Sequence, residues 1–241
     1  MKKLLPFIFG LAFFLTGDTP NISPSANIEE FVGDFSQVER REIKMGLEEA
    51  NKKFPLEIKI TVLKTKNEED IGAAFYNLNG DKYFKENYGY NLLKLLRGRN
   101  AVALRDFSAY KYSQEGLWNS VYMPNPDSSA LYRRAFLHEQ GHLIYEKVKT
   151  NLLRDELVEI DARNKVAEKE SKKQHPGHPS FYTFFYASTE CDLEGMKEVN
   201  ASETFADIFA LRVMGFLNNV SDPLLKRKIE LIDKTIRDFR D

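Results

Sequence analysis

Two histidines and a glutamate in the stretch FLHEQGH, residues 136–142, are the side chains best placed to do chemistry. On a helix, His138 and His142 project from the same face one turn apart, so both imidazoles can point at one ion. Zinc accepts nitrogen and oxygen ligands in a tetrahedral shell, and catalytic zinc sites keep one position for water. Glu139 lies beside that position and can take the proton of the water. The alternative is an amphipathic helix whose histidines meet solvent or make ordinary core hydrogen bonds.

The third ligand of such a site must come from elsewhere in the chain. Cys191 is the one cysteine, which excludes a cysteine ligand set. A third histidine six residues after His142, the metzincin arrangement, is excluded because Val148 occupies that position. The segment NASETFADIFALRVMGF places Glu203 and Asp207 four residues apart on an otherwise apolar helix, where charged side chains need a partner. We expect Glu203 to bind the metal and Asp207 to accept an imidazole N–H from behind.

Other acids and histidines leave alternatives open. Glu203 could instead close a capping box with Asn200, although this leaves Asp207 unexplained. Other acids lie between the two motifs, none in a comparably apolar setting; they include Glu156, Glu159, Asp161, Glu168, Glu170, Glu190, Asp192, Glu194 and Glu198. His175 and His178, in HPGHP, could belong to a second metal site or a substrate-binding loop, or could have no special role.

The elements that position these residues follow from hydrophobic periodicity and turn signals. The expected helices are 37–54, one that is capped by Asp127, Ser128 or Ser129 and runs to Val148, 202–217 and 222–239; the expected strands are 56–65, 100–106 and 119–123. The charged segment 149–180 is expected to be a solvated helix, or pair of helices, inserted into the domain. We also expect the short strand 119–123 to pair with an extended substrate. This order predicts an α+β fold with a small N-terminal mixed sheet, an active-site helix and a helical C-terminal part.

The N-terminus indicates export. Lys2 and Lys3 precede an apolar run from Leu4 to Leu15, which has the length of a signal peptide and is short for a membrane span. We therefore expect residues 1–17 to be a signal peptide or an N-terminal anchor, 18–36 a linker, and 37–241 the folded domain. The protein would then be secreted, periplasmic or attached to the cell surface, and would contact a membrane only through this segment.

Composition excludes some classes of partner. The chain has 35 basic and 36 acidic residues and a formal net charge of −1, so no overall field recruits nucleic acid. With 42% hydrophobic residues in 241, it can bury a sizeable core.

The two motifs, HEQGH at 138–142 and SETFAD at 202–207, resemble those of the gluzincin metallopeptidases. They look most like the compact group that contains the catalytic domain of anthrax lethal factor and the Pro-Pro endopeptidases. The resemblance implies a zincin-like domain with His138, His142 and Glu203 as zinc ligands and Glu139 as general base or acid. That group also has an oxyanion-stabilising tyrosine seven residues before the ligand glutamate, where this chain has Met196.

We therefore expect the tyrosine that stabilises the oxyanion at another position, near Met196. Tyr186, in the context YAS, is the expected residue and Tyr182 the reserve, while aromatic packing is the alternative for both. The resulting hypothesis is an exported, zinc-dependent endopeptidase that acts on a peptide or protein substrate. The alternative is a catalytically inactive zinc-binding protein that binds peptides or a protein partner.

Overall fold

The computed structural model of the protein describes residues 27–55, 58–64, 72–79, 82–105, 122–123, 128–171, 178 and 194–240. Its strands are β1 (Asn27–Val32), β2 (Lys59–Lys64), β3 (Gly72–Phe75) and β4 (Asn100–Leu104). Its helices are α1 (Gln37–Lys53), α2 (Lys82–Tyr88), α3 (Tyr90–Leu95), α4 (Ser128–Val148), α5 (Asn151–Ser171), α7 (Glu194–Val213) and α8 (Pro223–Arg240).

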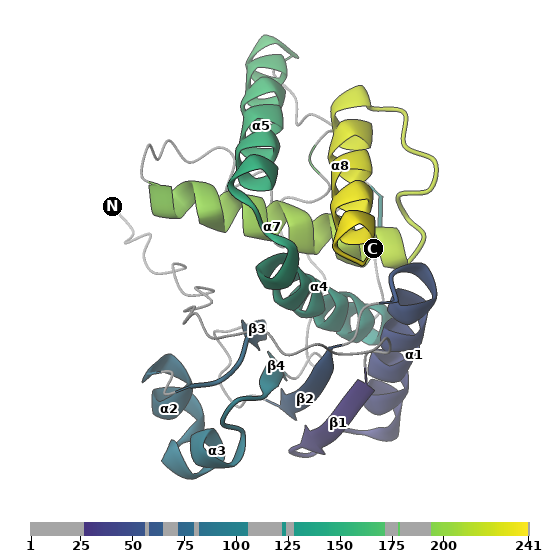
Figure 1. Cartoon of the computed structure of the whole chain (residues 1–241). Helices are drawn as coiled ribbons and strands as arrows, with labels where there is room; N and C mark the ends of the chain where they lie inside the picture. Colours follow the sequence, from purple (N-terminus) through teal and green to yellow (C-terminus); the bar gives the residue numbers. More distant parts are fainter. Residues whose placement is uncertain are drawn as a thin grey trace, which may run out of the picture.

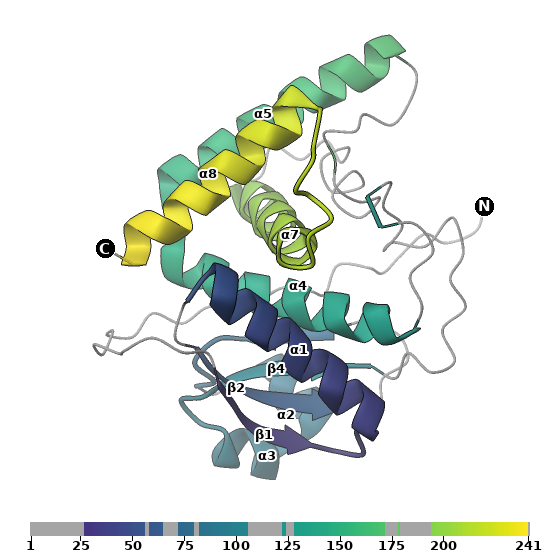
Figure 2. The same ribbon diagram turned by 90° about the vertical axis from the view of Figure 1, so that its right-hand side faces the viewer.

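The strands form one small mixed sheet in the order β1-β2-β4-β3. The first three run parallel and β3 pairs antiparallel with β4. Alternate side chains of β4 enter two different cores: Val102 packs toward α1 and α4, whereas Ala103 packs toward α2 and α3. Helices therefore cover both faces of the sheet (Figure 2).

Above the sheet, the C-terminal half of the chain is helical. Helix α7 packs on α4, and the antiparallel pair α5 and α8 covers the other side of α7 (Figure 1, Figure 2). The result is a mixed α+β fold, as predicted, with α4 and α7 at its centre.

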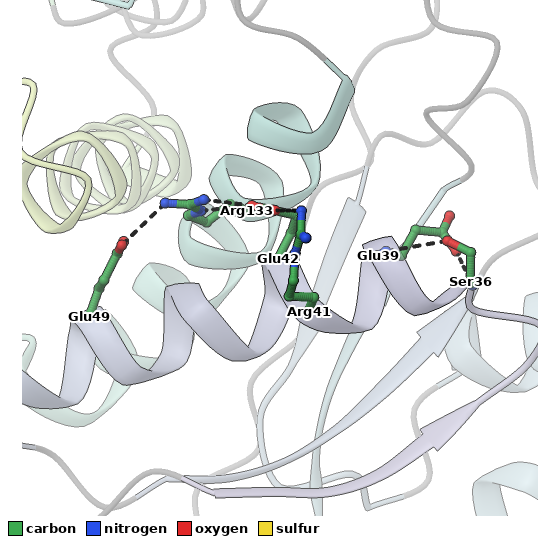
Figure 3. Close-up of polar contacts among 6 residues, drawn as sticks. All are labelled: Ser36, Glu39, Arg41, Glu42, Glu49 and Arg133. Atoms are coloured by element: carbon green, nitrogen blue, oxygen red, sulfur yellow. Dashed lines mark hydrogen bonds and ion pairs between the residues drawn. The ribbon is translucent and has the colours of Figure 1, made fainter.

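Helix α1 is fixed at its start and along its length by charge. Ser36 caps it in a capping box with Glu39, which explains why the helix begins at Gln37. Arg133 of α4 reaches down to Glu42 and Glu49 of α1, at 2.6 and 3.1 Å (Figure 3). These contacts attach α4 to the sheet layer through α1.

Two sequence predictions need correction, and one strand was missed. The linker expected at 18–36 contains β1, which pairs with β2, so that the described fold begins at Asn27. The segment 149–180 was expected to be solvated, but its helix α5 buries Leu153, Leu157 and Ile160 in the main core. Strand β3 was not predicted at all.

Helix α7 begins at Glu194, eight residues before its predicted start at Ser202, and ends at Val213. Gly215 stops it with φ of +84°, and the N–H of Phe216 donates to the carbonyl of Leu211. The other predicted helices, and the strands near residues 60 and 102, are confirmed.

Two predictions fall mainly outside the described residues. The N-terminal segment 1–17 is one of them. Of the predicted strand 119–123, only Tyr122 and Met123 are described, and Met123 forms an isolated bridge. No helix in the described part of the chain is both long enough and apolar enough to cross a membrane.

Candidate metal centre

Helix α4 carries the histidine motif through the middle of the protein. His138, Glu139 and His142 are all buried, with 3%, 6% and 8% of their surface exposed. The helix can be apolar nearly all round because α1, the sheet and α7 surround it. Its polar side chains therefore have to be satisfied by protein groups or by an ion.

Helix α7 supplies the acidic partner. Glu203 is 3% exposed, and its carboxylate faces the two histidines. Because α7 begins at Glu194, Asn200 lies inside the helix and cannot be its N-cap. The capping-box alternative for Glu203 is therefore wrong.

Three donor atoms of these residues converge. Nε2 of His138 lies 3.1 Å from Nε2 of His142 and 3.2 Å from Oε2 of Glu203, and the third distance, from His142 to Glu203, is 3.4 Å. Zinc–ligand bonds of about 2.0–2.1 Å at tetrahedral angles place neighbouring donors about 3.3–3.4 Å apart. His138, His142 and Glu203, hereafter the metal cluster, thus form a buried group that can bind a metal ion.

The charges in and around the metal cluster also favour a bound cation. Burial alone would lower the pKa of His142, but the carboxylates of Glu203, Glu139 and Glu146 outweigh it and raise that pKa to about 9. Burial would raise the pKa of Glu203, yet the two imidazoles lower it to about 2. The carboxylates around His142 and the imidazoles around Glu203 therefore favour positive charge at this position. A divalent cation would satisfy all three donors at once.

A close approach of the two helices sets the spacing of the donors. A Cβ atom added to Gly141 would lie 2.7 Å from Cα of Ala206, a distance too short for any side chain, and the close neighbour is backbone, which cannot rotate away. Glycine in HEQGH is therefore required by the contact between α4 and α7. Ala206 lies between Glu203 and Asp207, so this contact sets the position of both acids.

Ser202 holds the second histidine from behind. Its Oγ lies 2.8 Å from Nδ1 of His142, on the side of the ring opposite the metal cluster. An Nδ1–H donated to this hydroxyl leaves the lone pair on Nε2, as a metal ligand requires. The sequence prediction missed Ser202, although its position directly before Glu203 was a signal.

Asp207 occupies the place predicted for it, but its main partner differs. Its Oδ1 lies 3.9 Å from Nδ1 of His138, which is too long for a hydrogen bond. The same oxygen accepts a hydrogen bond of 2.9 Å from Nη2 of Arg134, which is fully buried. Arg134 was missed by sequence analysis; an arginine one turn before His138 on an apolar helix was the available signal.

Further acidic residues lie near His142. Burial raises the pKa of Glu146 to about 7, against the influence of Lys149, which lies 2.8 Å from its carboxylate. Burial and Glu198 also raise the pKa of the Tyr145 hydroxyl. The metal cluster thus lies in an acidic environment, which favours a cation.

A second buried polar group lies on the opposite face of α7. Asp161 of α5, 2% exposed, forms an ion pair with the fully buried Lys228 of α8 and accepts a hydrogen bond of 3.1 Å from Thr204. We call Asp161, Thr204 and Lys228 the lysine cluster. The expectation that no acid other than Glu203 and Asp207 lies in an apolar setting is wrong for Asp161, because α5 packs into the core.

The structure describes some of the remaining candidate site residues and not others. His178 is buried, with Nδ1 3.9 Å from Asp161, and so lies beside the lysine cluster. His175, Tyr182 and Tyr186 lie outside the described residues. Glu156, Glu159 and Glu198 pair with Arg227, Arg163 and Lys149.

Comparison of the chain with protein-family models, with curated proteins and with solved structures gave no significant match. The metal cluster and its surroundings therefore carry the information about function.

Proposed function

We propose that the protein is a zinc-dependent endopeptidase of the gluzincin type with a zincin-like fold. The observation that carries the proposal is the triangle of donor atoms from His138, His142 and Glu203, with sides of 3.1, 3.2 and 3.4 Å. Two imidazoles and one carboxylate are a ligand set that zinc accepts while keeping a position for water. The resemblance of both motifs to gluzincins supports the choice of zinc and of peptides as substrates.

Glu139 supplies the group that would move the proton. It lies between the two histidines in sequence and is close enough to raise the pKa of His142. A bound zinc ion would act as a Lewis acid and make water nucleophilic at neutral pH. Glu139 would accept the proton of the attacking water and deliver it to the leaving nitrogen of the peptide. Tyr186 remains the proposed stabiliser of the oxyanion.

The test compares the wild type with Glu139→Gln and Glu203→Gln. The wild type should bind one zinc ion per chain, measured by elemental analysis, and should cleave components of a diverse peptide mixture, measured by mass spectrometry. Glu139→Gln should keep its zinc and lose about 100- to 10,000-fold of the cleavage rate, because only proton transfer is removed. Glu203→Gln should lose both zinc and activity.

Glu198→Gln is the matched control. Glu198 is an acid on the same helix as Glu203, but it pairs with Lys149 at 3.2 Å. This variant should retain zinc and cleavage. Wild-type zinc content in Glu203→Gln would disprove the ligand assignment. A zinc-loaded wild type without cleavage of any peptide would favour the zinc-binding protein without turnover.

A further inference from the structure

Arg134 is a fully buried arginine on α4, one helical turn before His138. Arginine stays charged at any pH that proteins experience, so its burial needs a specific acceptor. Its Nη2 donates to Oδ1 of Asp207 at 2.9 Å, and the two side chains are 0% and 1% exposed. The contact joins α4 to α7 directly beside the metal cluster.

The oxygen that Arg134 holds is also the one nearest to His138. Oδ1 of Asp207 lies 3.9 Å from Nδ1 of His138, while Nε2 of the same ring belongs to the donor triangle. The Oδ2 atom of Asp207 has no hydrogen-bond partner among the described residues. The position of the carboxylate behind His138 therefore depends on Arg134.

We propose that Arg134 is a positioning residue for the metal cluster: its guanidinium holds Asp207, and through Asp207 it sets the orientation and tautomer of His138. The inference rests on the proposed function, since it assumes that His138 is a zinc ligand. A carboxylate behind a ligand histidine favours the tautomer with the proton on Nδ1 and the lone pair on Nε2; at 3.9 Å, Asp207 would act through its charge rather than through a direct hydrogen bond. The hydrogen bond of 2.9 Å from Arg134 holds this carboxylate in place behind the ring, where a buried carboxylate without a partner would be costly.

The experiment measures zinc affinity by competition with a chelator in Arg134→Met, Arg134→Lys, Asp207→Asn and the double variant Arg134→Met/Asp207→Asn. Loss of a residue that orients a ligand weakens metal binding about 10- to 100-fold. Arg134→Met and Asp207→Asn should each show a loss of this size. The double variant should lose no more than the larger single loss, because both residues act through the same contact. Arg134→Lys keeps the charge and should recover part of the affinity.

Arg133→Met is the matched control. Arg133 is the neighbouring residue on α4, but it points the other way and pairs with Glu42 and Glu49 of α1 (Figure 3). Arg133→Met removes these partly buried ion pairs and leaves the contact to Asp207 intact. The variant should have a lower thermal midpoint of unfolding and a zinc affinity within about two-fold of the wild type. The visible absorption bands of the Co²⁺-loaded protein report ligand geometry; they should change in Arg134→Met and stay as in the wild type in Arg133→Met.

The possible outcomes separate the two proposals. A wild type that binds no zinc would overturn the proposed function itself. A wild type that binds one zinc ion, together with an Arg134→Met variant of unchanged affinity and Co²⁺ spectrum, would overturn only the role of Arg134. Additive losses in the double variant would overturn it as well. If Arg134→Met does not fold, Asp207→Asn decides: an unchanged zinc affinity and Co²⁺ spectrum in that variant would reject the positioning role.

Discussion

Two buried polar clusters lie back to back on α7, and they satisfy buried charge in different ways. Glu203 faces α4 as part of the metal cluster, while Thr204, the next residue, faces α5 and α8 as part of the lysine cluster. In the lysine cluster the ammonium of Lys228 neutralises the carboxylate of Asp161. In the metal cluster two imidazole nitrogens and a carboxylate oxygen converge, and only a proton is available to balance them without an ion.

The comparison of the two clusters shows how a buried acid that can bind a metal differs from one that pairs with a lysine. Asp161 and Glu203 are equally buried, at 2% and 3% exposure, so burial does not distinguish them. Their partners do: a protein cation completes the first cluster, whereas the second consists of atoms that bind metals. Each cluster can therefore be changed alone, and the two should respond in different quantities.

The largest effect is expected from Lys228→Met. Removing the ammonium leaves the Asp161 carboxylate buried without its cation, which destabilises proteins by about 3–5 kcal/mol. Urea unfolding should show this loss, while the zinc content stays at one ion per chain. The double variant Asp161→Leu/Lys228→Met removes both charges and should recover most of the stability. Loss of zinc from a folded Lys228→Met variant would contradict the separation of the two clusters.

Gly141→Ala should act mainly on the metal cluster. Its Cβ would lie 2.7 Å from Cα of Ala206, so α7 must move away from α4 and carry Glu203 with it. Overpacking of this kind costs about 1–3 kcal/mol, and we expect zinc affinity to fall by up to about 100-fold. Gly46→Ala is the control, because its Cβ would meet only side chains, Arg133 and Leu137, at 3.1 and 3.3 Å. Equal zinc affinities in the two variants would refute the role of the helix contact.

The metal-free protein should lose stability as the pH rises from 7 to 9. The pKa of His142 is raised from 6.5 to about 9 in the folded chain, so folding is favoured by a proton that the unfolded chain has released. This contribution is complete below pH 6.5 and is lost as the pH passes 9. The expected fall between pH 7 and pH 9 is about 2 kcal/mol. The raised pKa of Glu146, about 7, adds a smaller fall of about 0.4 kcal/mol at the start of this window.

Chelator-treated protein, unfolded in urea at each pH, provides the measurement. Glu203→Gln removes the main charge that raises the pKa of His142 and should flatten the dependence. A slope that is unchanged in this variant would show that His142 is not its source.

The residues of the metal cluster could be predicted from sequence because each motif lies within one or two helical turns. His138 and His142 are one helical turn apart, and Glu203 and Asp207 are acids within an apolar helix. For Arg134 the signal was ambiguous: it lies one turn before His138, but Arg133 is adjacent, and only the packing of α4 shows which of the two arginines faces α7. The same holds for Asp161, whose charged helix became part of the core only through contacts with α7 and α8.

The fold was predicted in outline for a similar reason. The amphipathic helices and the two apolar strands were recognised from periodicity. Strand β1, NIEEFV, carries two glutamates, and β3, GAAF, is short and made of small residues. Both become strands through pairing with β2 and β4, which the local sequence does not encode.

The smallest expected effects come from two hydroxyls on α7, Ser202 and Thr204, which belong to different clusters. Ser202→Ala removes the contact of 2.8 Å behind His142 and should lower zinc affinity about tenfold, with little change in stability. Thr204→Val keeps the volume but removes the hydrogen bond to Asp161, which should cost about 1 kcal/mol of stability and leave zinc affinity unchanged. Chelator competition and urea unfolding on both variants give four measurements. A loss of zinc affinity in Thr204→Val as large as in Ser202→Ala would mean that the clusters are coupled through α7. Separate responses would establish that two faces of one helical turn serve metal binding and folding independently.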